Sequence, residues 1–287
     1  MGFNRIEAKV AAKTSMRLTR PSVMLVTLVY LLLTTVLTLV LLNLVYNPLA
    51  DIYVHVEIRN YGLEETLEYI LRTHFSGVII FALLRLLLNV YTSVMDVGYT
   101  SYGLRMARGE QPGFINLFDG FAKLGRVLWM NLLVWLFTTL WSFLAMLPAA
   151  FVAFGILYWE WNVNTFTGVY TLLLLAGVAV RIIITYRYRL AAYFLIDDPA
   201  CPAREAIRRS KEAMRGWKME LFTLDISFIG WYYLSVLTAG ILLVWLLPYR
   251  QAAEANFYDC VTATPPSTGG YVGPDYDYRD PDGPQKF

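Results

Sequence analysis

The sequence predicts an all-α integral membrane protein: a bundle of about six transmembrane helices, accompanied by amphipathic cytoplasmic helices. Hydrophobic residues make up 57% of the 287 residues. Charged residues make up only 16%, whereas soluble domains carry about 25% charge. Long apolar runs recur along the chain, and about 20 apolar residues cross the hydrocarbon core as one helix. Together these observations exclude a disordered chain and an ordinary soluble domain.

Four apolar runs define the first predicted spans. They are 23–46, 76–102, 127–159 and 161–187. The first run is too long for a signal-peptide core and lacks a small-residue cleavage pattern, so we expect it to be retained. Only the second and fourth runs contain charged residues in their apolar part, namely Arg85, Asp96 and Arg181.

The last apolar region allows two topologies. A single tilted helix over 226–249 gives five spans and places the C-terminal tail outside. A break at 238–240 gives instead two arms, 217–237 and 241–258, and places the tail inside. We favour this hairpin and six spans. Its turn brings Arg250 to the depth of Asp225, so the two side chains are predicted to pair.

Lysine and arginine counts orient the chain. Three segments, 1–20, 105–126 and 187–218, hold 17 of the 24 basic residues. The segment 47–75 has two basic residues against five acidic ones. Because basic loops stay on the cytoplasmic side, the N-terminus and the other two basic segments are predicted to be cytoplasmic.

Two basic helices are expected at the inner leaflet. The first is a basic amphipathic N-terminal helix over 1–20, whose basic residues recur every four positions and share one face. An alternative is that these residues only orient the first span. The second helix is 203–215, between Pro202 and Gly216, and we expect it to face lipid phosphates or solvent, not nucleic acid. The predicted inner-leaflet contacts are Arg5, Lys9, Lys13, Arg17, Arg208, Arg209 and Lys211.

The chain divides into three parts. The N-terminal helix occupies 1–20, the transmembrane helical domain 21–260, and the tail 261–287. The tail is rich in Pro, Gly, Tyr and Asp. It lacks an apolar period, which predicts disorder.

Ionisable residues at membrane depth are costly and mark candidate functional positions. Arg85, Asn89 and Asp96 share one face of the second span, while Arg181 and Asp225 lie in later spans. These five are the candidate substrate- or lipid-binding residues. The first pairings to test are Arg85 with a carboxylate, and Arg181 with Asp96 or Asp225. The alternative function is structural: a buried ion-pair network that fixes helix packing.

The third span carries a ladder of small residues, Ala145, Ala149 and Ala153, which suits close helix contact. Pro148 lies inside the ladder and is predicted to kink the helix. The contact is explained equally by packing within one chain and by dimerisation.

No enzyme motif is present. The sequence lacks a nucleophile elbow, a zinc-protease motif and a phosphate-binding loop. Cys201 and Cys260 are far apart and no Cys/His ligand spacing exists, so we expect no metal and no cofactor. The acidic pair Asp197-Asp198 next to Pro199 is expected to form a turn that precedes the 203–215 helix. The sequence therefore favours a protein that is not an enzyme.

Three stretches after the fourth predicted span form a recognisable pattern. They are Y-x-L-A-A-Y-F-L-I-D-D-P at 188–199, E-A-I-x-x-S-K-E-A-M-R-G-W-K at 205–218 and L-T-A-G-I-L-L-V-W-L-L-P-Y at 237–249. Over about the last quarter of the chain before the tail, the sequence resembles a bacterial multi-pass membrane family known as domain of unknown function 975. The stretch L-W-S-F-L-A-M-L-P at 140–148 is similar too, although Ala149 stands where the family usually has Gly. The resemblance implies a plasma-membrane protein with a cytoplasmic N-terminus, and it supplies no catalytic residues.

These observations favour a non-enzymatic membrane scaffold or accessory factor for transport or for lipid and envelope homeostasis. The family's distant similarity to membrane domains fused to glycerophosphodiesterases implies lipid or headgroup handling. The expected partners are membrane lipids with anionic headgroups, and a membrane protein or a second copy of the chain. The alternative is a transporter or channel whose polar path runs through Arg85, Asp96, Arg181 and Asp225.

Overall fold

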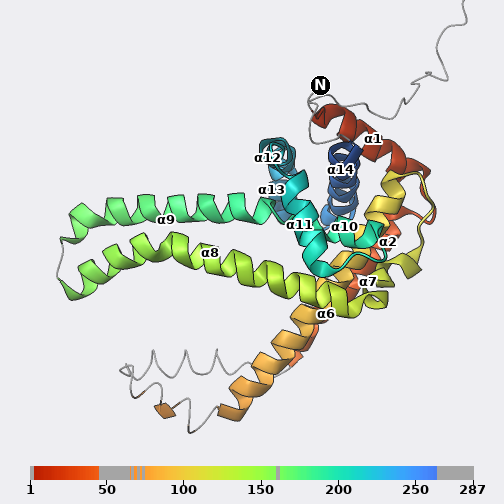
Figure 1. Cartoon of the computed structure of the whole chain (residues 1–287). Helices are drawn as coiled ribbons and strands as arrows, with labels where there is room; N and C mark the ends of the chain where they lie inside the picture. Colours follow the sequence, from red (N-terminus) through yellow and green to blue (C-terminus); the bar gives the residue numbers. More distant parts are fainter. Residues whose placement is uncertain are drawn as a thin grey trace, which may run out of the picture.

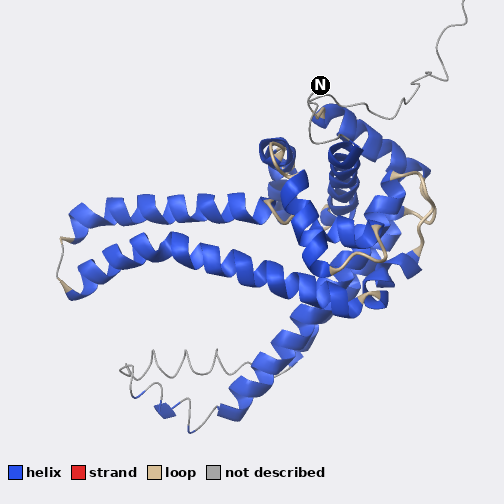
Figure 2. Ribbon diagram, in the orientation of Figure 1, coloured by secondary structure: helices blue, strands red, loops and turns tan. Residues whose placement is uncertain are grey.

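The structure is a computed structural model that describes residues 3–44, 75–159 and 162–263, with four isolated positions between 65 and 72. Within this part of the chain every regular element is a helix (Figures 1 and 2). The helices are α1 Arg5–Leu18, α2 Val23–Leu31, η1 Leu32–Val36, α3 Leu37–Leu44, α6 Phe75–Ala107, η3 Phe114–Phe118, α7 Asp119–Ala122, α8 Leu124–Tyr158, α9 Val163–Tyr186, α10 Ala191–Asp197, α11 Ala203–Ala213, α12 Lys218–Ile226, α13 Ile229–Leu237 and α14 Leu243–Ala263.

Four helical segments are long and apolar enough to cross a membrane. They are Val23–Asn43, Phe75–Ala107, Leu124–Ile156 and Phe166–Asp197. Each corresponds to one of the first four predicted spans, so the prediction of an all-helical chain with several candidate membrane-spanning helices is confirmed. Only 6% to 17% of the residues in their most apolar windows are buried, as expected for helices that contact lipid.

The six-span count is not confirmed. The predicted break is present, because Ala239 and Gly240 have φ angles of 50° and 85° and separate α12–α13 from α14. Neither arm, however, is among the candidate spans of the described chain. The first arm is interrupted between α12 and α13, and α14 crosses the direction of α8 and α9 (Figure 1). The break at 238–240 predicted the hairpin, but it did not predict how the two arms are tilted.

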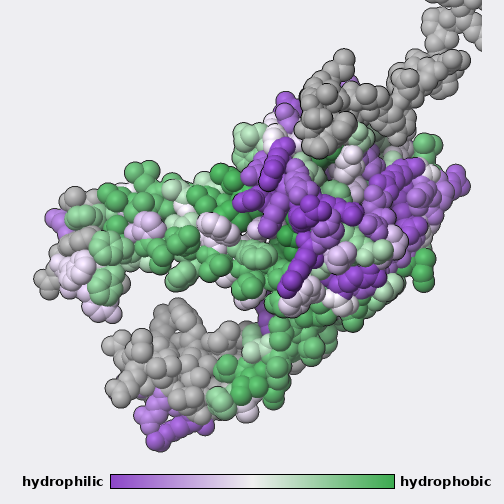
Figure 3. Space-filling view, in the orientation of Figure 1, coloured by the Kyte–Doolittle hydropathy of each residue, from purple (hydrophilic) through white to green (hydrophobic). Residues whose placement is uncertain are grey.

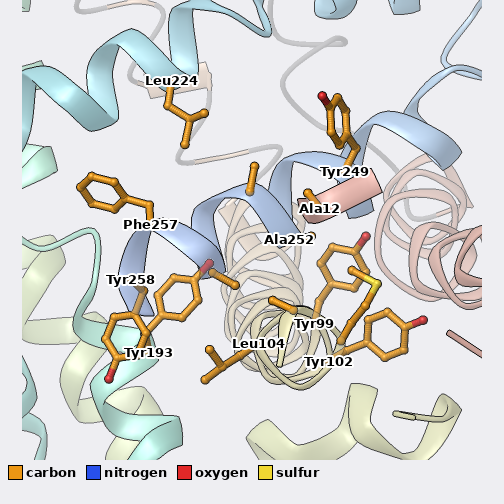
Figure 4. Close-up of a cluster of buried hydrophobic side chains, with 14 of the residues drawn as sticks. Ala12, Tyr99, Tyr102, Leu104, Tyr193, Leu224, Tyr249, Ala252, Phe257 and Tyr258 are labelled. Carbon is orange, nitrogen blue, oxygen red and sulfur yellow. The ribbon is translucent and has the colours of Figure 1, made fainter. Parts of the chain in front are cut away.

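Helix α14 is the centre of the core. Eleven of its 21 residues are buried, and α1, α2, α6 and α10 pack around it. Figure 4 shows Tyr193 of α10 beside Tyr258 of α14, with ring centroids 5.1 Å apart. The ring of Phe3, next to α1, meets Phe257 edge-on at 5.0 Å. The core therefore gathers the two ends of the described chain.

The second half of α6 is held by a backbone contact with the segment that follows it. A Cβ atom at Gly98 would lie 1.9 Å from the carbonyl oxygen of Leu117. A Cβ atom at Gly120 would lie 2.2 Å from the carbonyl oxygen of Val94. Only glycine allows this approach at both positions, so η3 and α7 are pressed against α6.

Helices α8 and α9 form a long antiparallel hairpin that extends away from the core (Figure 1). The small-residue ladder lies inside it: Ala149 is buried, and a Cβ atom at Gly177 of α9 would lie 3.0 Å from Met146 Sδ. The ladder thus serves packing within the chain. Helix α8 continues through Pro148. Figure 3 shows that the outer surface of this hairpin is mostly hydrophobic.

The three basic segments meet at one end of the molecule. The Arg20 amide donates to Gln111 Oε1 at 2.7 Å, and Arg108 pairs with Asp197 at 2.5 Å. The guanidinium of Arg126 donates to the carbonyl oxygen of Pro199. This common location agrees with the shared side of the membrane that their charge predicts. The first three residues of the predicted tail, 261–263, belong instead to α14, and the remainder of the tail lies outside the described residues.

Candidate functional site

A bidentate ion pair joins the end of α9 to the central helix. Arg189, in the turn after α9, donates from Nε to Glu254 Oε1 at 2.6 Å and from Nη2 to Oε2 at 2.9 Å. The Glu254 side chain is 6% exposed and that of Arg189 32%. Parallel charge-assisted hydrogen bonds of this kind are strong and directional. The pair therefore fixes α14 relative to the fourth candidate span.

A second pair lies one helical turn away on α14. Arg250 Nη2 and Nε each lie 3.2 Å from Asp225 Oδ1, and Arg250 Nη1 donates to the Tyr232 hydroxyl at 3.2 Å. The Tyr186 hydroxyl donates to Asp225 Oδ2 at 2.7 Å. These contacts connect α9, α12, α13 and α14, and they confirm the predicted pairing of Arg250 with Asp225.

The two pairs are coupled through α14. Glu254 Oε2 lies 3.9 Å from Arg250 Nη2, so Glu254 lies between the two guanidinium groups. We call Arg189, Glu254, Arg250 and Asp225 the ion-pair network.

A cavity of about 310 Å³ lies on one side of the network. Asp96 lines it and accepts a hydrogen bond from the Tyr30 hydroxyl at 2.5 Å. Gln251 Nε2 donates to the Tyr193 hydroxyl at 2.9 Å on another wall. The wall of this cavity therefore combines hydroxyl, amide and carboxylate groups.

A larger cavity of about 660 Å³ lies on the other side of the network. Arg181 and Asp225 line it, and most of the remaining wall is apolar. Arg189 and Arg250 line both cavities. The network therefore adjoins both cavities, of which the larger has the more apolar wall.

The structure places three of the five candidate residues at the cavities and the other two away from them. Asp96 lines the smaller cavity, and Arg181 and Asp225 line the larger one. Arg85 and Asn89 are exposed on the first half of α6. Within the described residues neither of these two side chains has an ion-pair or hydrogen-bond partner, and the Arg181 guanidinium also lacks one. The predicted pairing of Arg85 with a carboxylate is thus not found, and Asp225 pairs with Arg250, not with Arg181.

Sequence reasoning missed the principal pair, Arg189 with Glu254. Arg189 belongs to the basic segment 187–218, whose charge predicts only its side of the membrane, and Glu254 lies in the predicted arm 241–258 without a predicted partner. The two positions are 65 residues apart, so no local spacing connects them. The available signal was a carboxylate placed among the small residues Ala252, Ala253 and Ala255.

A further charged cluster lies where the basic segments meet. Arg108 contacts Asp197 at 2.5 Å and Asp259 at 2.7 Å, and the Tyr258 hydroxyl donates to Asp197 at 3.1 Å. These contacts raise the pKa of Arg108, chiefly through the hydrogen bond to Asp197. Lys123 Nζ donates to the carbonyl oxygen of Leu195 at 3.0 Å. The cluster ties the ends of α6, α10 and α14 together.

The predicted inner-leaflet residues of α1 differ in their surroundings. Arg5 and Arg17 are exposed. Lys9 Nζ lies 4.3 Å above the ring of Phe228 and Lys13 Nζ 5.5 Å above that of Tyr249, which are cation–π distances. Burial lowers the pKa of Lys9. Two of the four basic residues on α1 therefore also anchor it to the core.

On α11 the predicted contacts are mostly engaged within the helix. Glu205 accepts from Arg208 at 2.6 Å and from Arg209 at 3.0 Å. These hydrogen bonds lower the pKa of Glu205 to about 2. Lys211 Nζ lies 5.3 Å from the ring centroids of Phe137 and Tyr188. Helix α11 thus packs on α8 while Arg208 stays exposed.

Comparison with known proteins gives one result. No curated protein and no solved structure matches the chain. A family model described as a protein of unknown function, DUF975, matches residues 1–265. The match covers the N-terminal helix, all four candidate spans and the ion-pair network, and the chain therefore belongs to the domain of unknown function 975 family.

Proposed function

We propose that this chain is a non-enzymatic membrane scaffold or accessory factor of the bacterial plasma membrane, with its N-terminus in the cytoplasm. The observation that carries the proposal is the ion-pair network. Its four charged groups are satisfied by one another and by tyrosine hydroxyls. Breaking a buried pair leaves an uncompensated charge, so such a network holds helices in one arrangement.

The distribution of apolar surface supports the same function. The core is concentrated at the end where the basic segments meet, while α8 and α9 extend from it with exposed apolar side chains such as Trp135, Phe143 and Leu172. A hairpin of this form offers a long surface to lipid, to a partner membrane protein or to a second copy. Arg5 and Arg17 on α1 are available to anionic headgroups. In this proposal the core holds the α8–α9 hairpin and α1 in place for their contacts with lipid or a partner.

One observation favours the alternative, a transporter or channel. The two cavities share Arg189 and Arg250 as lining residues. A rearrangement of the network would join Asp96 to Asp225 and Arg181 in one polar path. Arg85 lies outside that path, because it is exposed on the first half of α6.

A flux assay separates the two functions. The full chain is reconstituted into vesicles loaded with potassium, sodium, chloride or inorganic phosphate, and efflux is compared with that from protein-free vesicles. The scaffold function predicts that, for each of the four probes, efflux from vesicles with the protein equals efflux from protein-free vesicles. Asp96→Asn and Asp225→Asn are measured alongside.

The contrary result would be protein-dependent efflux of one probe that a cavity variant abolishes while its thermal midpoint stays at the wild-type value. That result would assign the cavities to transport. Asn89→Ala is the matched control, since Asn89 lies on α6 outside both cavities.

A further inference from the structure

The larger cavity combines three guanidinium groups with an apolar wall. Arg181, Arg189 and Arg250 line it, and Asp225 is the acidic residue in its lining. The cavity therefore carries an excess of positive charge. A volume of about 660 Å³ is within the range of small-molecule and cofactor sites, which is roughly 300–1,000 Å³.

Arg181 differs from the other two arginines. Arg189 is paired with Glu254 and Arg250 with Asp225. Within the described chain the Arg181 guanidinium has no such partner, although α9 is a candidate membrane span. An unpaired cation at membrane depth is costly and requires a counter-charge or access to the headgroup layer.

The position of Arg181 along α9 indicates which counter-charge it meets. Arg187 begins the basic segment at the end of α9, and Arg181 lies about 9 Å before it at about 1.5 Å per residue. The headgroup region of one leaflet is roughly 5–8 Å deep. An arginine side chain at this depth reaches the phosphates of the leaflet on the basic side.

The rest of the wall fits acyl chains. Ile182, Ile226 and Ile229 line the cavity and are 41%, 44% and 60% exposed. Since these side chains are both cavity wall and outer surface, the cavity opens sideways between α9 and the α12–α13 arm. Such an opening admits a molecule whose charged end is inside and whose apolar part remains in the hydrocarbon.

We infer that this cavity binds one anionic phospholipid, with its phosphate on Arg181 and its acyl chains along Ile182, Ile226 and Ile229. Guanidinium groups bind phosphate through paired hydrogen bonds. The inference deepens the proposed function and rests on it to the extent that both require a membrane-embedded chain. It does not require the ion-pair network to open, because the network only forms the far wall.

The test measures the thermal midpoint of the full chain in detergent against short-chain phosphatidylglycerol. The wild-type midpoint rises with lipid concentration and saturates. Arg181→Gln requires at least tenfold more lipid for the half-maximal shift. Arg85→Gln is the matched control, because Arg85 is also an exposed arginine within a candidate span but lies outside the cavity. It responds as the wild type does.

Four results would overturn the inference. Two concern the ligand: a shift of equal size with inorganic phosphate, which would indicate a free-anion site, or with phosphatidylcholine, which carries no net charge. Two concern the variants: an equal loss of response in Arg85→Gln, or an unchanged response in Arg181→Gln.

A second variant tests the apolar opening. Ile229→Trp fills the opening without touching the charges and is also expected to weaken the response at least tenfold. This variant carries the test if Arg181→Gln does not fold. All these variants leave the Arg189–Glu254 pair intact, so a failure here leaves the scaffold proposal standing.

Discussion

At the residue scale, Glu254 is the one charged residue that is buried in the described part of the chain, and its partner comes from a segment far away in the sequence. Glu254 is 6% exposed and accepts both of its short hydrogen bonds from Arg189. Arg250 is held by Asp225 from α12 and by Tyr232 from α13. Burying these charged groups costs free energy, and the partners that other segments of the fold supply offset that cost.

Gly98 is predicted to be required for the close contact between α6 and η3. Gly98→Ala places a Cβ atom 1.9 Å from the Leu117 carbonyl oxygen, so η3 must move away from α6. We expect a loss of about 1–3 kcal/mol in the free energy of unfolding, typical of overpacking. The control is Gly230→Ala in α13, where no atom lies within 4 Å of the added Cβ. It should stabilise the helix by about 0.5–1 kcal/mol. Denaturant unfolding in detergent distinguishes the two, and equal effects would contradict the close contact.

Glu205 gives a pH-dependent prediction. Its pKa is lowered from 4.5 to about 2 by hydrogen bonds from Arg208 and Arg209. A group with a lowered folded-state pKa contributes stability above its unfolded pKa and loses it as the pH falls through the folded value. The difference in thermal midpoint between wild type and Glu205→Gln should therefore be constant from pH 7 to about pH 5. It should narrow below about pH 4.5, and a difference that widens there would contradict the contacts.

The sequence predicted one of the two network pairs, for a physical reason. Asp225 and Arg250 flank a single turn at similar distances, so the hairpin alone brings them together. Arg189 and Glu254 meet only after α10, α11 and the hairpin have folded, and no periodicity in the chain expresses that. Predicting the cavities would have required the tilt of α14, which the sequence pattern does not encode.

At the element scale, apolar run length predicted the elements well and their directions less well. The four candidate spans match the predicted runs because crossing hydrocarbon requires about 20 apolar residues. The 203–215 helix was predicted from Pro202 and Gly216, and α11 begins directly after Pro202, while Gly216 has a φ of 83°. The last two arms were predicted as spans, but α14 is a buried core helix that also carries polar residues.

The alternation of the helices gives a topology prediction. Tyr158, at the end of α8, is 70% exposed, and Arg204 of α11 lies at the opposite, basic end. A membrane-impermeant thiol reagent should label Tyr158→Cys in intact cells. Arg204→Cys should be labelled only after permeabilisation. The native Cys201 and Cys260 are buried and provide a low background. Labelling of Arg204→Cys in intact cells would reverse the proposed orientation.

At the scale of the whole molecule, stability and contact surface are separated in space. The buried core and the ion-pair network lie near the basic end, while the α8–α9 hairpin is exposed along most of its length. The near-neutral net charge of +2 therefore conceals a polarised molecule. In the proposed scaffold the core would lie at one leaflet and the apolar hairpin would cross the bilayer.

A double-mutant cycle on Arg189 and Glu254 tests the central claim, that the ion-pair network fixes this fold. Arg189→Gln, Glu254→Gln and the double variant are unfolded in detergent. Arg208→Gln with Glu212→Gln is the control cycle on an exposed pair of side chains, 61% and 50% exposed. Each single network variant should lose about 2–4 kcal/mol, below the full value for a buried pair because Arg189 is partly exposed. The double variant should lose less than the sum of the losses of the two single variants, with a coupling of about 1–3 kcal/mol.

The control cycle should show a coupling below about 0.5 kcal/mol. Additive losses in the network cycle, or single variants as stable as the wild type, would contradict the claim.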